Sequence, residues 1–250
     1  MERWQNKVAV VTGASSGIGA AVVKDLVNAG LIVVGLARRV GRVEELKEQV
    51  AAGKQQNLYA RQCDVSNEDS VNEGFDWIEK NLGGIDILLN NAGLYKEGNL
   101  CELDTNILQG ILQTNVMGVV YCTKRAFKSM KERNFDGHVL IINSISGHNV
   151  LNTAILKSPS SNICSPSKFA VTAMTEVYRQ EFNNLETKIK ITSISPGLVS
   201  TEMLPEQLKK TMLGRTLLPE DISNAVLFAI STPPHVQIHE LTIKPVGEVL

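Results

Sequence analysis

Short apolar runs recur along the whole chain and are separated by longer amphipathic stretches. Each run is rich in Val, Ile and Leu and has the length of a β-strand rather than of a helix. The predicted strands are residues 7–11, 31–36, 58–63, 85–89, 138–142, 190–194 and 240–243.

The stretches between these runs carry helical periodicity. Residues 42–52 are predicted to be helical, Ser66 to cap the helix that follows it, and residues 108–133 to hold a long amphipathic helix. Pro219 opens the last helix, at a position where its missing N–H costs nothing. The alternation predicts an α/β protein, with one Rossmann-type domain over residues 1–250 and a doubly wound parallel sheet of about seven strands with helices on both faces.

A glycine-rich turn, TGASSGIG, joins the first strand to the helical stretch after it. Glycines let the backbone pass close to a pyrophosphate, and a helix N-terminus offers it unpaired N–H groups and a positive dipole. An ordinary tight turn is the alternative, but the position between strand and helix favours a dinucleotide site. The candidate phosphate-binding residues are Gly13, Ser15, Ser16, Gly17, Ile18 and Gly19.

The residues that end the second and third strands bear on which dinucleotide binds. In a Rossmann unit, an acidic residue after the second strand bonds a free ribose 2′-hydroxyl and selects NAD. This strand ends instead in Arg38 and Arg39, which can pair with a 2′-phosphate and therefore favour NADP, although both could be solvated surface arginines. Asp64, after the third strand, either receives the adenine amine or caps the following helix.

Composition excludes several function classes. The net charge of −1 argues against a nucleic-acid binder, and no apolar run is long enough to span a bilayer. The polar start MERWQNK does not resemble a secretory signal, and the four cysteines form no CxxC pair, so we expect reduced thiols and a cytoplasmic location. The four histidines lack zinc-like spacing, so no metal site is expected.

Several further motifs make the chain resemble the short-chain dehydrogenases/reductases over nearly its whole length. They are TGASSGIG at 12–19, CDV at 63–65, NNAG at 90–93, Asn115 within TNVMG, NSISG at 143–147, Lys168, and Pro196-Gly197 with Thr201. A narrower likeness, to insect farnesol dehydrogenase-like members and related vertebrate proteins, is carried by MERW, SPSKFAVTAMTE and PPHVQIHELTIKP.

This resemblance implies an NADP-dependent oxidoreductase of alcohols and carbonyls, with an isoprenoid or other aliphatic alcohol as the small-molecule substrate. It also implies a homodimer or homotetramer that pairs the long helices, here roughly 108–133 and 165–185. The implied catalytic residues are Ser144, Asn115 and Lys168, and Lys168 would also grip the nicotinamide ribose. The other implied cofactor contacts are Val65, Asn90, Ala92, Gly93, Pro196, Gly197, Val199 and Thr201.

Each catalytic assignment has a structural alternative. Ser144 could be a strand-end serine that satisfies the backbone, and Lys168 could be a surface lysine. Asn115 is unusual within an apolar helix, and it could be a buried asparagine bonded to backbone as well as part of a proton relay. Tyr95 either lines the substrate cleft or packs as an ordinary aromatic residue.

The chain departs from this family at one catalytic position. The family places a tyrosine four residues before its lysine, and position 164 of this chain is Cys164. A free thiol has a pKa of about 8.5 against about 10 for a phenol. We expect Lys168 to lower the pKa of the thiol further, so reach rather than acidity is the expected obstacle to proton transfer. The segment from residue 149 to 162 is also longer than is usual in the family and is expected to bulge beside the cleft.

Three hypotheses follow. The chain could be an oxidoreductase impaired by Cys164, with a bridging water in the space of the phenol. It could be an NADP(H)-binding pseudoenzyme that acts as a sensor or scaffold. It could also have lost the ligand, although the intact glycine turn speaks against this. Cys164 itself could be a plain buried residue or a redox-sensitive thiol.

Overall fold

The computed structural model describes residues 1–150, 162–204 and 214–248. In this part of the chain one parallel sheet of seven strands has the order β3-β2-β1-β4-β5-β6-β7. The strands are β1 (Val8–Thr12), β2 (Ile32–Ala37), β3 (Leu58–Gln62), β4 (Ile87–Asn90), β5 (His138–Ile142), β6 (Lys190–Pro196) and β7 (Glu240–Ile243). The predicted single α/β domain with a doubly wound sheet is confirmed, and each predicted strand is present to within two residues at either end.

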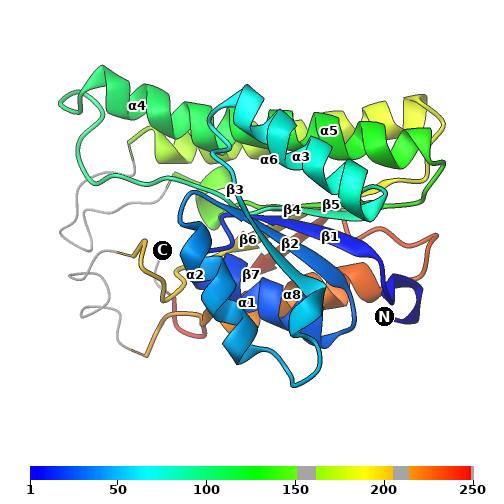
Figure 1. Ribbon diagram of the computed structural model, residues 1–250. Coiled ribbons are helices and arrows are strands. Elements are labelled where there is room, and N and C mark those ends of the chain that lie inside the picture. The colour runs from blue at the N-terminus through cyan, green and yellow to red at the C-terminus, as the bar shows by residue number, and fades with distance from the viewer. Residues whose placement is uncertain (151–161, 205–213, 249–250) are drawn as a thin grey trace.

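Helices cover both faces of the sheet, as Figure 1 shows. One layer holds α1, α2 and α8, and the opposite layer holds α3, α4, α5 and α6. The α-helices are α1 (Gly17–Asn28), α2 (Val40–Glu44), α3 (Glu68–Leu82), α4 (Thr105–Leu112), α5 (Gly118–Glu132), α6 (Cys164–Asn184) and α8 (Pro219–Ser231). None of the described helices is long and apolar enough to cross a membrane.

Two hydrophobic cores result, one on each face of the sheet. Val10, Val34 and Leu88 point to the face covered by α3, α5 and α6, whereas Ala9 and Val33 point to the face covered by α1 and α8. Neighbouring strand residues alternate between faces, and both faces are buried, so the strands read as unbroken apolar runs in the sequence.

Two predicted helices differ from those found. The predicted helix 42–52 is instead the short α2 followed by a 3-10 turn at Glu45–Gln49, because Val43 and Leu46 are both buried at the three-residue spacing of such a turn. Ser66 does not cap α3, since its hydroxyl donates to Asp64 Oδ1 at 2.7 Å. Asn67 is the cap, with its Oδ1 accepting from the Ser70 N–H at 2.9 Å.

The predicted long helix 108–133 is divided by a π-helical turn. Helix α4 runs into this turn at Gln113–Met117, and α5 continues from it. A π turn inserts one residue into a helix and is often found at functional sites. This turn carries Asn115, so the irregularity falls on a candidate catalytic residue.

The order of the strands places a crevice where the chain direction reverses. β2 and β3 lie on one side of β1, while β4 to β7 lie on the other. Ligands of doubly wound sheets bind at the carboxyl ends of the strands near such a switch point. Residues 151–161 of the inserted segment and residues 205–213 of the loop between β6 and α8 lie outside the described residues.

Candidate functional site

A cavity of about 410 Å³ opens at the carboxyl edge of the sheet. Its lining comes from the glycine turn after β1, the ends of the other central strands, the π turn, and the start of α6. Nearly all predicted site residues line it, namely Gly13, Ser15, Ser16, Gly17, Ile18, Arg38, Arg39, Asp64, Val65, Ala92, Gly93, Asn115, Ser144, Cys164, Lys168, Pro196, Gly197, Val199 and Thr201. The structure therefore brings together residues from both halves of the chain.

The glycine turn has the shape of a cradle that only glycine can form. Gly13 and Gly17 have φ angles of 64° and 55°, in the left-handed region that side chains rarely adopt. A Cβ atom at Gly13 would lie 2.8 Å from Ala92 Cα, so the turn also packs closely against the loop after β4. Its backbone lies open to the cavity at the N-terminus of α1, which suits a pyrophosphate.

Gly19 lies next to this cradle but does not line the cavity. A Cβ atom on Gly19 would lie 2.5 Å from both Gly13 O and Asn91 Nδ2. Its role in this structure is close packing of α1 on the turn, and the expectation that it lines the phosphate site is corrected.

Asn90 is the second predicted cofactor contact that lies outside the cavity lining. It is buried on β4, and its Nδ2 donates to Thr123 Oγ1 of α5 at 3.0 Å. Asn91 lines the cavity instead, and its Nδ2 donates to the carbonyl oxygens of Thr12 at 2.9 Å and Gly13 at 3.2 Å. The side chain of Asn90 therefore faces α5, and its contact with a cofactor stays a prediction.

Both arginines after β2 line the cavity beside the glycine turn. Arg39 Nη2 donates to Ser16 Oγ at 3.1 Å and to Ser15 Oγ at 3.4 Å. The other side of the guanidinium pairs with Glu202 at 3.3 Å. Arg38 also lines the cavity. Positive charge therefore lies beside the glycine turn, where a ribose 2′-phosphate would need it.

Asp64 lies at the start of the turn that leads into α3. It lines the cavity, and its Oδ1 accepts from the backbone N–H of Ser66 at 3.0 Å as well as from the Ser66 hydroxyl. The carboxylate thus holds the turn that leads into α3, while the cap itself is Asn67. Contact between Asp64 and an adenine amine stays a prediction.

Asn115 is held rigidly in the π turn. Its Oδ1 accepts from the Leu94 N–H at 2.7 Å, and its Nδ2 donates to Leu94 O and to Ser167 Oγ, both at 3.1 Å. The side chain is only 3% exposed. The alternative of a buried, backbone-bonded asparagine therefore applies, and the residue also lines the cavity.

Ser144 and Lys168 both lie near the carboxyl end of β5. Ser144 Oγ accepts from the Ser146 N–H at 3.0 Å, as a strand-end serine does, and still lines the cavity. Lys168 is partly buried rather than a surface lysine, and its Nζ donates to Ile142 O at 2.8 Å. Burial lowers the pKa of this ammonium to about 8, so it stays mostly protonated at neutral pH.

Cys164 begins α6 and lines the same corner. Its Sγ donates weakly to Leu94 O at 3.8 Å. Burial raises the pKa of the thiol, although a backbone hydrogen bond from Lys96 and the charge of Lys168 act in the opposite direction. Lys168 therefore acts in the expected direction, but desolvation by burial outweighs it and the net shift of the thiol pKa is upward.

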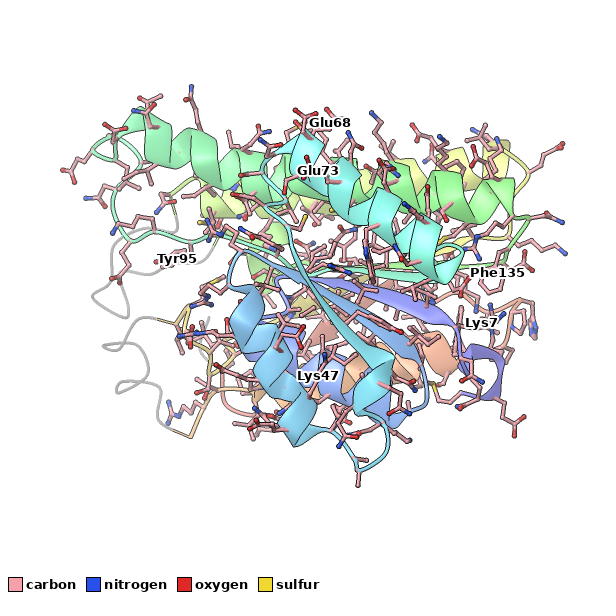
Figure 2. The ribbon with its side chains drawn as sticks, in the orientation of Figure 1. Lys7, Lys47, Glu68, Glu73, Tyr95 and Phe135 are labelled. Carbon is pink, nitrogen blue, oxygen red and sulfur yellow. The ribbon has the colours of Figure 1, made fainter. Side chains whose placement is uncertain are left out.

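Tyr95 lines the cavity as well, rather than packing away from it. Figure 2 shows it at the carboxyl edge of the sheet, at the far end of the molecule from Lys7 and Phe135. Burial raises its pKa to about 12, and negative charge on Glu97 and Cys164 adds to this effect. The phenol therefore keeps its proton throughout the physiological range.

Glu202 and Glu248 are functional candidates that sequence reasoning missed. Glu202 lines the cavity and pairs with two arginines. Glu248 lies near the C-terminus, where its buried carboxylate accepts from the Leu198 N–H at 3.3 Å and would clash with any Cβ on Gly197. No spacing rule connects these glutamates to residues so distant in sequence, so the sequence carried no signal for them.

The chemistry of the cavity lining fits a nicotinamide dinucleotide. Gly13 and Gly17 present their backbone to the cavity without side chains. Guanidinium and hydroxyl donors lie at one end, and the ammonium of Lys168 lies at the other. An elongated ligand with phosphates near one end suits this arrangement.

The chain is similar to known proteins in sequence and in fold, as three examples show. It is 53% identical to farnesol dehydrogenase of Aedes aegypti over 250 residues, which is 99% of each protein. It is 42% identical to human dehydrogenase/reductase SDR family member 11, over 100% of this chain and 98% of the relative. The alcohol dehydrogenase of Thermococcus sibiricus, solved with 5-hydroxy-NADP, superposes with a TM-score of 0.84 at 26% identity over 97% of each chain.

Residues 7–211 also match the short chain dehydrogenase family. This match includes the glycine turn, Asn115, Ser144 and Lys168. Since it covers most of the chain, and the relatives are similar over their whole length, the protein belongs to the short-chain dehydrogenases, a family of oxidoreductases that use a nicotinamide cofactor.

Proposed function

We propose that this protein is an NADP(H)-dependent oxidoreductase that acts on the CH–OH group of an alcohol or on the matching carbonyl. The observation that carries the proposal is that one cavity holds the glycine cradle, the arginines, Ser144 and Lys168. The farnesol dehydrogenase relative supports an isoprenoid or other aliphatic alcohol as substrate. The many apolar lining residues at the substrate end, among them Leu94, Met203 and Leu204, suit such a chain.

The residues of the corner have separate roles in this proposal. When bound, NADP(H) supplies or accepts the hydride. Ser144 holds the substrate oxygen through its hydroxyl, and the ammonium of Lys168 favours negative charge that develops there. Asn115 fixes the backbone of Leu94, which forms the wall of the corner.

The proton passes by way of water in this proposal. The Cys164 thiol already donates to Leu94 O, and its raised pKa keeps it protonated. A water in the space beside Ser144 and Cys164 is therefore the group that exchanges a proton with the substrate. Loss of a direct general acid–base residue costs about 10²- to 10⁴-fold in rate, so turnover is slow but not absent.

NADP rather than NAD is supported by the charge at the adenosine end. Arg38 and Arg39 line the cavity there, and Arg39 is already directed at Ser15 and Ser16 of the turn. An Arg39→Gln variant should bind NADPH at least tenfold more weakly while NADH binding changes less than twofold, as measured by fluorescence titration. Equal loss for both cofactors would contradict the NADP preference.

A pseudoenzyme that binds NADP(H) and turns over little is the second candidate. The observation that favours it is that the Cys164 thiol, although it lines the cavity, donates to the backbone oxygen of Leu94. In that case the protein acts as a sensor or scaffold, and ligand occupancy is the signal.

One assay separates these two functions. Turnover with NADP⁺ and a panel of aliphatic and isoprenoid alcohols is measured for the natural protein and for Cys164→Tyr. Activity of the natural protein that disappears in Ser144→Ala and Lys168→Ala establishes the enzyme. A silent natural protein with an active tyrosine variant favours the pseudoenzyme. If neither the natural protein nor Cys164→Tyr turns over any alcohol although both bind NADPH, then Cys164 is not the one residue that separates this site from an active one.

We further propose a homodimer or homotetramer in which the long helices of one copy, α4–α5 and α6, pack against those of another copy. Exposed apolar side chains on these elements support the pairing, among them Ile107, Leu112 and Phe169. Light scattering after size exclusion tests it, because a monomer at micromolar concentration would contradict it.

The four unpaired cysteines support a reducing compartment such as the cytoplasm.

A further inference from the structure

Glu202 reaches across the mouth of the cavity. It lies on the loop that follows β6, which runs beside α2 in Figure 1. Its Oε1 and Oε2 lie 2.8 Å and 3.0 Å from Arg42 Nη1 of α2, and Oε2 lies 3.3 Å from Arg39 Nη1. Hydrogen bonds from Arg42, and then the charges of both arginines, lower the pKa of Glu202, so it is a carboxylate at neutral pH.

Arg39 is shared between this carboxylate and the glycine turn. One terminal nitrogen pairs with Glu202, while the other donates to the hydroxyls of Ser15 and Ser16. A guanidinium binds an anion best when both of its terminal nitrogens face that anion. A phosphate beside Ser15 and Ser16 therefore meets an arginine whose second donor is already held by a carboxylate.

The loop is anchored next to this pair, so Glu202 stays close to the site. Thr201 packs against the turn, with its Cγ2 3.0 Å from the position of a Cβ on Gly17. Both Thr201 and Glu202 line the cavity. Any anion bound to Arg39 therefore lies near a fixed negative charge, and like charges at this distance repel.

We infer that Glu202 is a cofactor-specificity residue that competes with the 2′-phosphate of NADP(H) for Arg39. This inference rests on the proposed NADP preference. Glu202 weakens NADP(H) binding and leaves NAD(H) binding nearly unchanged, since NAD(H) carries no phosphate at that position. Arg42 is a positioning residue in this scheme, because its two contacts draw the carboxylate away from Arg39.

Two substitutions should therefore shift affinity in opposite directions. Glu202→Gln keeps the shape of the side chain and removes its charge, so NADPH binding should tighten about 3- to 10-fold. Among the described residues, Arg42→Gln leaves Arg39 as the one partner of Glu202, so NADPH binding should weaken. The double variant should resemble Glu202→Gln alone, because Arg42 acts only through Glu202.

The test is equilibrium binding and needs no turnover. NADPH and NADH are titrated by fluorescence, and adenosine 2′,5′-bisphosphate and AMP by calorimetry, because the members of each pair differ by the 2′-phosphate alone. Glu48→Gln is the matched control, since it removes the same charge from an exposed residue outside the cavity lining. Thermal denaturation checks that each variant is folded. Tighter binding of the two 2′-phosphorylated ligands only, with the control unchanged, is the expected result.

Three results would overturn the inference. Weaker NADPH binding by Glu202→Gln would show that the residue holds the bound cofactor in place. A selective loss of NADH would make Glu202 a partner of the ribose hydroxyl. Glu202→Gln could also leave NADPH affinity unchanged while Arg39→Gln weakens NADPH binding. That result would keep the NADP preference and show that Glu202 does not contribute to it. By contrast, no effect of Arg39→Gln on NADPH would overturn the NADP preference and this inference together.

Discussion

The two ends of the cavity are stabilised in different ways. At the nucleotide end, backbone shape and exposed charge dominate, through Gly13, Gly17 and Arg39. At the catalytic end, the polar side chains of Asn115 and Cys164 are bonded to the backbone of one residue, Leu94. Under the proposed function the nucleotide end receives the ligand with its exposed charge, whereas the polar side chains of the catalytic end already form a closed network of hydrogen bonds.

The contacts that hold Ser144 and Lys168 do not involve Cys164. Ser144 is held by the Ser146 N–H, and Lys168 by Ile142 O. A substitution at position 164 should therefore leave both residues in place, so the two ends can be perturbed separately.

The largest expected effect is at the nucleotide end, from Gly13→Ala. The positive φ is strained for alanine, and the new Cβ would lie 2.8 Å from Ala92 Cα. We expect a loss of about 2–4 kcal/mol in the free energy of unfolding and no measurable NADPH binding. Gly53→Ala is the control, because Gly53 has a φ of 82° but no atom near its Cβ position. It should lose only about 1 kcal/mol and bind NADPH normally. If the two variants lost the same stability and bound NADPH equally well, the proposed role of Gly13 in shaping the binding turn would be wrong.

Asn115→Ala should mainly affect stability, as expected of the catalytic end. The substitution removes the acceptor of the Leu94 N–H and leaves the Leu94 carbonyl with only the weak bond from Cys164 Sγ. Unfolding by urea should show a loss of about 2–3 kcal/mol, while NADPH affinity falls less than threefold. Asn106→Ala, at an exposed position of α4, should change stability by less than about 0.5 kcal/mol. A large loss of NADPH affinity without a loss of stability would reverse the contrast between the two ends.

Lys168 makes a smaller, pH-dependent contribution at the catalytic end. Its folded pKa of about 8 is below the usual 10.5, so between these values the unfolded chain binds more protons than the folded chain. The free energy of unfolding therefore rises with pH in this window, by at most about 1.4 kcal/mol per unit. Urea unfolding of the natural protein and of Lys168→Met should show a difference that shifts in favour of the natural protein from pH 7.5 to 9.5. A constant difference would mean that the folded ammonium titrates normally.

The sequence predicted those parts of the fold that depend on residues near one another in the chain. The strands His138–Ile142 and Glu240–Ile243 were predicted at their true bounds. The first is buried along its whole length, which makes its apolar run easy to recognise in the sequence. The π turn at Asn115 was not predicted, because its cause is the fit of one side chain to Leu94, more than twenty residues away.

The site was predicted to a similar extent and for the same reason. Motif positions gave most of the cavity lining, while the choice between Asn90 and Asn91 depended on strand orientation. Glu202 could not be predicted at all, since its partners on α2 are about 160 residues away in the sequence. Pairings across the cleft require the fold to be known first.

The smallest expected effect concerns the chemical reactivity of the thiols. Cys101 is exposed, whereas Cys164 is partly buried, bonded to Leu94 O, and has a raised pKa. Only the thiolate reacts with iodoacetamide, so at pH 7.5 Cys164 should be alkylated about tenfold more slowly than Cys101. Peptide mass spectrometry over a time course measures both rates, and bound NADP⁺ should slow Cys164 further because the two share one cavity. Alkylation of Cys164 ahead of Cys101 would instead show an activated thiol, and the catalytic end would then be a redox-sensitive site rather than a closed network.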